Sequence, residues 1–459
     1  MKPPPFAAWS ARAVFQLQER IKGHDSAQLR RQLEQSQWWT PAMIAELQLL
    51  RLRALLLHAQ EQVPYYRELF AQAGFNARAI HDLRDLRCLP VLRKREINRN
   101  AERFRSAQAG PLQRLTTGGS SGEALAFYLG RRRISHDVAA KWRATRWWNV
   151  DIGDREAVVW GSPIELKAQD HWRRLRDRLL RTTLLPAFDL SAQRMDEYLQ
   201  TLRRQRPAMM FGYPSALSRI AGHARARGVR LDDLGVRVVF ATAECLYPHQ
   251  RSLMEEVFAS PVANGYGGRD AGFIAHECPA GGMHISAEDI IVEILDPAER
   301  PLPPGQSGEI VVTHLATREF PFIRYGTGDI GAIEHRQCAC GRGLPLLGQV
   351  DGRSTDFIVT QDGATMHGLA LIYILREQAG ISAFKIIQES VQRTRIQIVH
   401  DSGLGAAQLN AITAQFKARL GPDVEILIEE TEAIQAEPSG KHRYVVSKVS
   451  QEGQACYPI

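Results

Sequence analysis

The sequence has 459 residues, about three times the length of a usual single domain, so we expect one large domain with smaller ones beside it. Its 58 Lys and Arg residues and 50 Asp and Glu residues give a net charge of +8, and the two signs are interleaved. This composition argues against collagen, disorder or a coiled coil. No apolar run reaches the roughly 20 residues of a bilayer span, and the first 20 residues lack a signal-peptide pattern, so we expect a cytoplasmic protein without a transmembrane segment.

The predicted elements begin with a helical segment over residues 1–110. Apolar residues recur there at three- and four-residue spacing, most clearly over 27–36 and 41–60, and glycines are few.

From Leu115 onward, short apolar runs followed by glycine alternate with helical stretches. Strand, helix and strand in this order predict an α/β core with a largely parallel sheet. The apolar runs lie at 157–161, 209–212 and 236–241, and the helical stretches lie at 192–204 and 214–228.

One dense basic run, residues 167–181, alternates arginines with tryptophan and leucine. The pattern is typical of a helix with a solvated basic face, and the alternatives are a phosphate site or attachment to an anionic membrane. No recognition module accompanies the run, so we expect no nucleic-acid partner.

Two blocks complete the chain. A strand-rich pattern over about 285–350 predicts a small β subdomain. Residues 353–459 have their own alternation of strands and helices and predict a mobile α+β lid, which leaves residues 1–352 as the N-terminal domain.

Residues 115–124 form a glycine-rich loop, Leu-Thr-Thr-Gly-Gly-Ser-Ser-Gly-Glu-Ala. Three glycines among four hydroxyl side chains let backbone N–H groups turn toward one point, which suits a polyphosphate. The loop lacks the Gly-Lys-[Ser/Thr] ending of a P-loop, which argues against a kinase or GTPase. Taken alone, a loop of this composition is a flexible turn at least as often as it is a phosphate site.

Four potential metal ligands come in two short clusters, Cys278 with His284 and Cys338 with Cys340. In a reducing cytosol, zinc is a better interpretation than a disulfide. Four protein ligands leave no open position, so the zinc would be structural. The alternative is four residues that hold no metal.

Four more motifs follow the glycine-rich loop, and with it they resemble, in order, the signatures of the adenylate-forming superfamily. That superfamily includes acyl-CoA synthetases, luciferases and nonribosomal peptide adenylation domains. The stretches 211–217, 274–278 and 338–342 resemble those of the phenylacetate-CoA ligases and their capsule-biosynthesis (CapK-like) branch, and the resemblance covers nearly the whole chain. The four motifs are Asn-Gly-Tyr-Gly-Gly-Arg-Asp at 264–270, Arg-Tyr-Gly-Thr-Gly-Asp at 324–329, Gly-Arg-Ser-Thr-Asp at 352–356 and Pro-Ser-Gly-Lys at 438–441.

The resemblance implies an ATP-dependent ligase that activates a small carboxylic acid as acyl-AMP, releases pyrophosphate and transfers the acyl group to an acceptor. The acceptor that the resemblance favours is CoA. An amine acceptor, an adenylylated hydroxyl product and a non-catalytic nucleotide-binding scaffold are the alternatives. The implied cofactors are ATP, Mg²⁺ and structural zinc, with CoA as cosubstrate, and a homodimer fits the family.

The resemblance also implies catalytic roles for Lys441, Asp270 and Arg353. Lys441 would lie between the carboxylate and the α-phosphate, where a cation lowers the repulsion between two anions. Asp270 stands where most relatives have a Mg²⁺-binding glutamate, and Arg269 stands where many have serine or threonine. This departure is the reason for the scaffold alternative. Arg353 would reach the ribose or a phosphate.

The remaining implied roles concern the nucleotide. The carboxylate of Asp329 would accept hydrogen bonds from both ribose hydroxyls, and Tyr266 would stack on the adenine. The plain alternatives are an aspartate that caps a turn and a tyrosine of the core. The implied nucleotide-binding set is Thr116, Thr117, Gly118, Gly119, Ser120, Ser121, Gly122, Ala243, Glu244, Tyr266, Gly267, Asp329 and Arg353.

Overall fold

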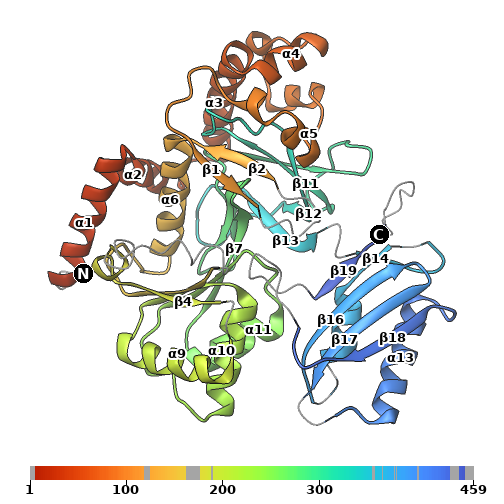
Figure 1. Ribbon diagram of the computed structural model, residues 1–459. Coiled ribbons are helices and arrows are strands. Elements are labelled where there is room, and N and C mark those ends of the chain that lie inside the picture. The colour runs from red at the N-terminus through yellow and green to blue at the C-terminus, as the bar shows by residue number, and fades with distance from the viewer. Residues whose placement is uncertain are drawn as a thin grey trace. The chain divides into compact units, whose positions relative to one another are not determined.

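The structure is a computed structural model. The chain folds into two compact units, one built mainly from residues up to Val350 and one mainly from Asp351 onward. Helices and strands are mixed throughout (Figure 1), which confirms the predicted α/β class. The described residues are 6–117, 125–161, 176–187, 190–353, 357–363, 365–376, 378, 380–400, 403–434 and 444–449.

The larger unit opens with helices, as the spacing of apolar residues predicts. In α3 the side chains of Leu52, Leu55 and Leu56 are buried on one stripe. This helix begins where the Thr40 hydroxyl accepts a hydrogen bond from the Met43 N–H, with Pro41 in the first helical position. The opening helices are α1 (Phe6–Lys22), α2 (Ser26–Ser36), α3 (Pro41–Gln62), α4 (Pro64–Gln72), η1 (Ala77–Ala79), η2 (Leu83–Cys88), α5 (Lys94–Arg99) and η3 (Ala101–Phe104).

An eleven-stranded sheet forms the centre of the larger unit, in the order β10-β11-β12-β13-β9-β8-β7-β6-β5-β3-β4. The five strands from β4 to β7 are parallel, as predicted for the α/β core. The strands are β3 (Glu156–Trp160), β4 (Thr182–Pro186), β5 (Met209–Gly212), β6 (Val238–Thr242), β7 (Val262–Gly268), β8 (Gly272–Glu277), β9 (Met283–Ile285), β10 (Ile290–Leu295), β11 (Gly308–His314), β12 (Tyr325–Glu334) and β13 (Leu346–Arg353).

The strands expected as a β subdomain are joined to this sheet. A tight turn after Gly268 reverses the chain, so that β8 pairs antiparallel with β7, and β9 then pairs antiparallel with β8 and β13. Main-chain hydrogen bonds therefore continue from the parallel strands into the segment of about 285–350.

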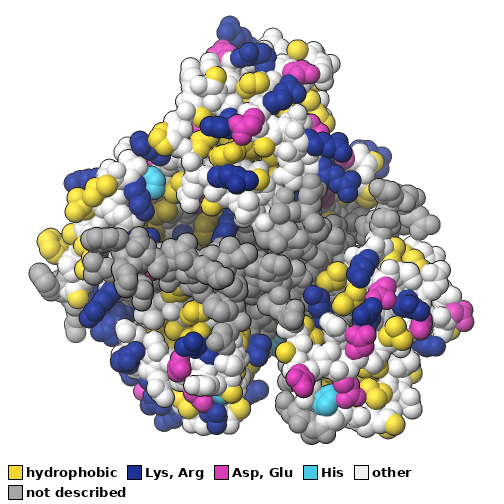
Figure 2. All heavy atoms as spheres, viewed as in Figure 1, with side chains coloured by type: hydrophobic (Ala, Val, Ile, Leu, Met, Phe, Trp, Pro, Cys, Tyr) yellow, Lys and Arg dark blue, Asp and Glu magenta, His cyan; other side chains and the backbone are white. Residues whose placement is uncertain are grey.

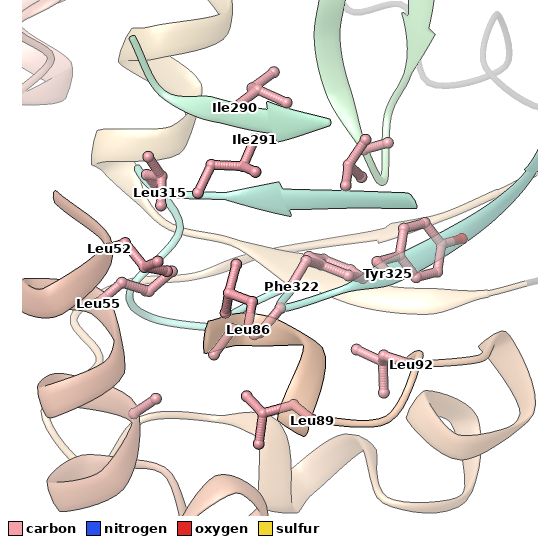
Figure 3. Close-up of a cluster of buried hydrophobic side chains, with 14 of the residues drawn as sticks. Leu52, Leu55, Leu86, Leu89, Leu92, Ile290, Ile291, Leu315, Phe322 and Tyr325 are labelled. Carbon is pink, nitrogen blue, oxygen red and sulfur yellow. The ribbon is translucent and has the colours of Figure 1, made fainter. Parts of the chain in front are cut away.

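The two largest apolar cores among the described residues hold most of these elements together. One lies between the opening helices and the antiparallel strands (Figure 3). The other lies between the parallel strands and the helices α9 (Ala192–Gln205), α10 (Pro214–Ala226) and α11 (Pro248–Phe258), which lie together beside these strands in Figure 1. Figure 3 labels Leu52, Leu55, Leu86, Leu89, Leu92, Ile290, Ile291, Leu315, Phe322 and Tyr325 in the first core.

The helix α6 (Arg131–Arg146) contacts α2 and the strand β8. Before it lies a hairpin of β1 (Gln113–Thr116) and β2 (Ala126–Leu129). The loop between these two strands is the predicted phosphate loop, and its residues 118–124 lie outside the described part of the chain.

The smaller unit has a four-stranded sheet in the order β18-β17-β16-β19, in which β16 and β17 are antiparallel. The alternation of strands and helices predicted after Asp351 is present here. The elements are β14 (Phe357–Val359), β15 (Thr365–His367), α12 (Leu369–Arg376), β16 (Ile381–Ser390), β17 (Arg393–His400), α13 (Ala406–Leu420), β18 (Glu425–Glu430) and β19 (Val445–Ser447).

Charged side chains of both signs are interspersed over the face shown in Figure 2. Most of the basic run lies outside the described residues, which omit 162–175. Among the helices that the structure describes, none is long and apolar enough to cross a membrane.

Candidate functional site

The two ends of the predicted phosphate loop are tied together. The Thr117 N–H donates to the Leu125 carbonyl at 2.9 Å, and the Leu125 N–H donates to the Thr117 hydroxyl at 2.9 Å. The hairpin continues this pairing with Thr116 opposite Ala126. The loop is therefore anchored at both ends on a rigid support, as a ligand loop requires.

The carboxyl ends of β5 and β6 bring two predicted segments together. The Ser215 N–H at the start of α10 donates to the Glu244 carboxylate at 3.1 Å, while the Thr242 hydroxyl donates to the Gly265 carbonyl at 2.7 Å. Ala243, which lies between Thr242 and Glu244 in the sequence, has φ of 71°. This left-handed conformation costs a non-glycine residue about 1–2 kcal/mol. Strained backbone of this kind often occurs at binding sites.

The neighbouring strand β7 carries Tyr266 and Gly267. The register with β8 shifts between these two residues, so the strand is irregular at this point, a common feature beside functional sites. A Cβ at Gly267 would lie 2.1 Å from the Gly272 carbonyl oxygen, so the two strands approach too closely for a side chain there.

Asp270 lies in the turn between β7 and β8, and its carboxylate is held on both oxygens. The Tyr325 hydroxyl donates to Oδ2 at 2.6 Å, and the Ala271 N–H donates to Oδ1 at 3.1 Å. The carboxylate has about four acceptor positions, and the described residues occupy two of them, which leaves two for a ligand. This geometry fits a site for a hard cation, which prefers oxygen ligands.

Tyr325 is itself placed by Arg324, which precedes it at the start of β12. Arg324 is buried, has φ of 51° and pairs with the Glu293 carboxylate at 3.0 Å. Its side chain also donates to the Leu89 carbonyl. Thr327 lies two residues after Tyr325, and its hydroxyl donates to the Ile310 carbonyl. Asp329 follows on the same strand.

Some predicted residues cannot be placed. Arg353 ends β13, but its side chain is not described. Lys441 lies outside the described residues, as do Gly118, Gly119, Ser120, Ser121 and Gly122.

The four predicted zinc ligands gather at one place. Their ligand atoms all lie within 4.8 Å of one another. The Cys278 Sγ is 3.6 Å from the Cys338 Sγ, and the His284 Nε2 is 3.1 Å from the Cys340 Sγ. The residues come from the end of β8, from β9 and from the β12–β13 connection, so the cluster joins segments 60 positions apart in sequence.

The protonation of two of these groups, His284 and Cys340, suits a soft cation. Burial lowers the pKa of His284 to about 4, which keeps the imidazole neutral, and its Nδ1 is 3.4 Å from the Leu344 carbonyl, so that Nε2 faces the cluster. Burial raises the pKa of Cys340, but hydrogen bonds from Arg342 outweigh it and the pKa lies below its ordinary value. Burial raises the pKa of Cys278 to about 12, so a bound cation would be needed to make that thiolate.

Two residues of the site escaped sequence reasoning. Tyr325 stands inside a recognised motif, but only the structure pairs its hydroxyl with Asp270. Arg133 donates to the main chain of Arg269 and Asp270, which lie 136 and 137 positions away in sequence. The one signal for it was a possible pair with Asp137, four residues later in a helical pattern.

Two family models match the chain. The model of the AMP-binding enzymes matches residues 181–316, and the model of the CapK C-terminal domain matches residues 358–448.

Known proteins are similar over most of the chain. CapK of Staphylococcus aureus is 21% identical over 423 residues, covering 88% of this chain and 89% of CapK. The phenylacetate-coenzyme A ligase of Thermus thermophilus is 24% identical over 390 residues, covering 82% and 83%. The crystal structure of 2-hydroxyisobutyryl-CoA ligase in the postadenylation state superimposes with a TM-score of 0.71 at 22% identity, covering 89% of this chain and 90% of that one.

The fold and these matches define an adenylate-forming enzyme, that is, an AMP-forming ligase that activates an acid. Within that superfamily, the chain is similar to CapK and to a phenylacetate-CoA ligase over 88% and 82% of its length, which confirms the resemblance seen in its motifs.

Proposed function

We propose that this enzyme converts a carboxylic acid and ATP into acyl-AMP and pyrophosphate, and then transfers the acyl group to CoA. In the first step, an oxygen of the acid forms a bond to the α-phosphorus and the bond to pyrophosphate breaks. In the second step, the CoA thiol loses its proton, its sulfur bonds to the acyl carbon and AMP leaves. Neither step requires a nucleophilic side chain, so the enzyme acts by positioning and by charge stabilisation.

The nucleotide would lie across the carboxyl ends of the parallel strands, where ligands of open α/β sheets bind. The loop after Thr117 would hold the phosphates with its backbone N–H groups. Ala243, Glu244, Tyr266 and Gly267 would line the adenine, Asp329 would accept hydrogen bonds from the ribose, and Arg353 would reach the ribose or a phosphate.

Asp270 would hold Mg²⁺ through its open acceptor positions, since the carboxylate is preset by Tyr325 and Ala271. When bound, Mg²⁺ would neutralise part of the charge on the phosphates. Aspartate is shorter than the usual glutamate, and a water between the carboxylate and the cation would bridge the difference.

Lys441 would neutralise the two anions as they approach. Its charge is most useful in the transition state, where negative charge gathers on the phosphorus oxygens.

We also propose that Cys278, His284, Cys338 and Cys340 hold one structural zinc. The donor set and its spacing support this assignment, since four soft or borderline ligands lie within 4.8 Å of one another.

The observation that carries the proposed activity is the convergence of three motifs at one edge of the sheet. Ser215 after β5 bonds to Glu244 after β6, and Thr242 of β6 bonds to Gly265 of β7. Asp270 follows β7, and its carboxylate is fixed from a fourth strand, β12.

The test is acid-dependent exchange of labelled pyrophosphate into ATP, run over a panel of aryl, fatty and amino acids. We expect an aryl or short-chain acid to support exchange, and added CoA to give a thioester and AMP. Exchange followed by transfer to an amine, but not to CoA, would replace the proposed acceptor. No exchange with any acid would show a nucleotide-binding scaffold instead.

A further inference from the structure

Arg133 is a fully buried guanidinium in the first turn of α6, and it contacts the turn that carries Asp270. Its Nη1 and Nη2 each donate to the Asp270 carbonyl at 3.3 Å, and Nη2 also donates to the Arg269 carbonyl at 3.4 Å. One rigid side chain therefore holds two successive carbonyl groups of the β7–β8 turn.

The guanidinium is itself fixed from two other places. Its Nε donates to both oxygens of Asp137 at 3.1 Å, and Nη1 donates to the Thr317 hydroxyl at 3.2 Å. The five N–H donors of arginine lie in one plane, so these bonds determine both the position and the orientation of the group.

The charges around Arg133 balance, and four of the six residues that carry them are buried. Arg133 faces Asp137, Arg143 pairs with Glu288 at 2.6 Å, and Arg51 pairs with Asp289 at 2.6 Å. These pairs contain three arginines and three carboxylates, so the cluster is neutral when every member is charged.

His136 and His314 lie beside the same carboxylate, and with Asp137 they approach one another as metal ligands do. Neither imidazole meets hydrogen-bond geometry with a described residue, although the His136 Nε2 lies 3.4 Å from a carboxylate oxygen of Asp289. The positive charge of the Arg133 guanidinium already neutralises the Asp137 carboxylate. A divalent cation would add uncompensated charge to this balanced group. The geometry therefore favours a structural role for the arginine over a metal at this place.

We propose that Arg133 is a positioning residue for Asp270: by holding the main chain of the turn, it aims the carboxylate at the cation that accompanies ATP. The proposal rests on the proposed role of Asp270. The contacts of Arg133 orient the backbone of that residue, whereas the Tyr325 hydroxyl orients its side chain.

The absence of a side chain at Gly272 makes room for this contact. A Cβ there would lie 3.0 Å from the Arg133 Nη2 and 2.8 Å from the His314 Nε2, and the backbone has φ of 91°. The turn and the guanidinium are thus packed against each other without space for a methyl group.

The test compares Arg133→Lys with Arg143→Lys. Both arginines are fully buried on α6, but Arg143 contacts Glu288 and Ser286 and not the turn. Lysine keeps the charge but cannot hold Asp137, Thr317 and two carbonyl groups at once. Binding of ATP with and without Mg²⁺ is measured by isothermal titration calorimetry, and pyrophosphate release is measured beside it.

We expect the gain in ATP affinity on adding Mg²⁺ to fall about tenfold in Arg133→Lys, as the loss of a charged hydrogen bond suggests. In Arg143→Lys the gain should stay within about twofold of the wild type, although both variants lose thermal stability. An unchanged gain in Arg133→Lys, or an equal loss in the two variants, overturns the proposal.

A milder pair of variants covers the case in which Arg133→Lys does not fold. Thr317→Val removes one hydroxyl that holds the guanidinium, and Thr145→Val removes a buried hydroxyl of α6 that bonds to the Trp142 carbonyl instead. We expect a smaller loss of the Mg²⁺ effect in the first and none in the second. An identical Mg²⁺ effect in both overturns the proposal.

Asp270→Asn separates this inference from the proposed function. If that variant keeps the full Mg²⁺ effect, the role of Asp270 fails and the role of Arg133 fails with it. If the effect is lost in Asp270→Asn but kept in Arg133→Lys, only the positioning role fails.

Discussion

The hydroxyl of Tyr325 gives the site a single atom that can be removed without disturbing the packing of the ring. Tyr325→Phe leaves the buried ring in place and removes the donor to Asp270. A hydrogen bond to a charged group contributes about 1.5–3 kcal/mol, so we expect kcat/KM for adenylation to fall roughly tenfold or more. Steady-state pyrophosphate release at several Mg²⁺ concentrations measures the loss.

Tyr198→Phe is the matched control for this variant. The Tyr198 hydroxyl donates to the Pro186 carbonyl and takes no part in the proposed site. Equal activity losses in the two variants would show that the hydroxyl of Tyr325 acts only through stability.

Lys441 provides a second test on the scale of one residue. We expect Lys441→Ala to lower pyrophosphate release by about a hundredfold or more, the usual effect of removing a group that stabilises transition-state charge. ATP binding should stay nearly intact, because the charge acts mainly in the transition state. Lys448→Ala, at an exposed lysine in the same unit, is the control. Turnover unchanged by Lys441→Ala would reject the role.

Among the elements, the connection between β12 and β13 is tied to the end of β8 by the four predicted zinc ligands. We expect purified, denatured protein to release about one zinc per chain. Cys338→Ser should lose the metal and lower the Tm, because metal binding contributes to folding. Metal content by atomic emission and a thermal melt are the measurements.

Cys88→Ser serves as the control because this cysteine is exposed and free. If Cys338→Ser melts like Cys88→Ser and neither protein holds zinc, the cluster is only four packed side chains.

The positions of helices and strands were the part of the fold that the sequence predicted best. The buried stripe of α3 and the alternation of strands and helices were visible as periodicity, because burial repeats with the geometry of the element. Pairing between distant elements was not visible. Nothing in the local pattern of Arg133 or Tyr325 indicates that either one reaches Asp270, since that contact exists only after the sheet has formed. The continuation of the sheet through β8 was hidden for the same reason, because strand order is a property of the tertiary fold.

The same distinction applies to the site residues: some could be grouped from the sequence and others could not. Cys278 and Cys338 could be grouped from the sequence because ligand types and short spacings carry metal chemistry. The contact between Ser215 and Glu244 could not, because a main-chain donor leaves no mark on residue type.

For the whole molecule, the buried histidine His314 predicts a loss of stability in acid. Burial and the charge of Arg133 hold the pKa of His314 well below its ordinary value, and His136 and Asp137 are its other titratable neighbours. The unfolded chain takes up this proton below about pH 6.5 while the folded chain does not, so stability is complete above that pH and falls as the pH drops.

We expect this group to steepen the pH dependence by about 1.4 kcal/mol per pH unit below pH 6.5. Urea unfolding of the wild type and of His314→Gln between pH 5 and 8 measures it, since glutamine takes up no proton in either state. Parallel curves for the two proteins would contradict the prediction.

The equal number of arginines and carboxylates in the pairs around α6 also limits how the sequence of this enzyme can change in evolution. If one member is replaced by a neutral residue, the interior is left with an uncompensated charge, which is strongly destabilising. A lineage can therefore alter these positions only by exchanging partners together or by passing through a poorly folded intermediate. We expect comparisons among descendants to show Arg133 and Asp137 changing as a couple, whereas the surface charges vary one at a time.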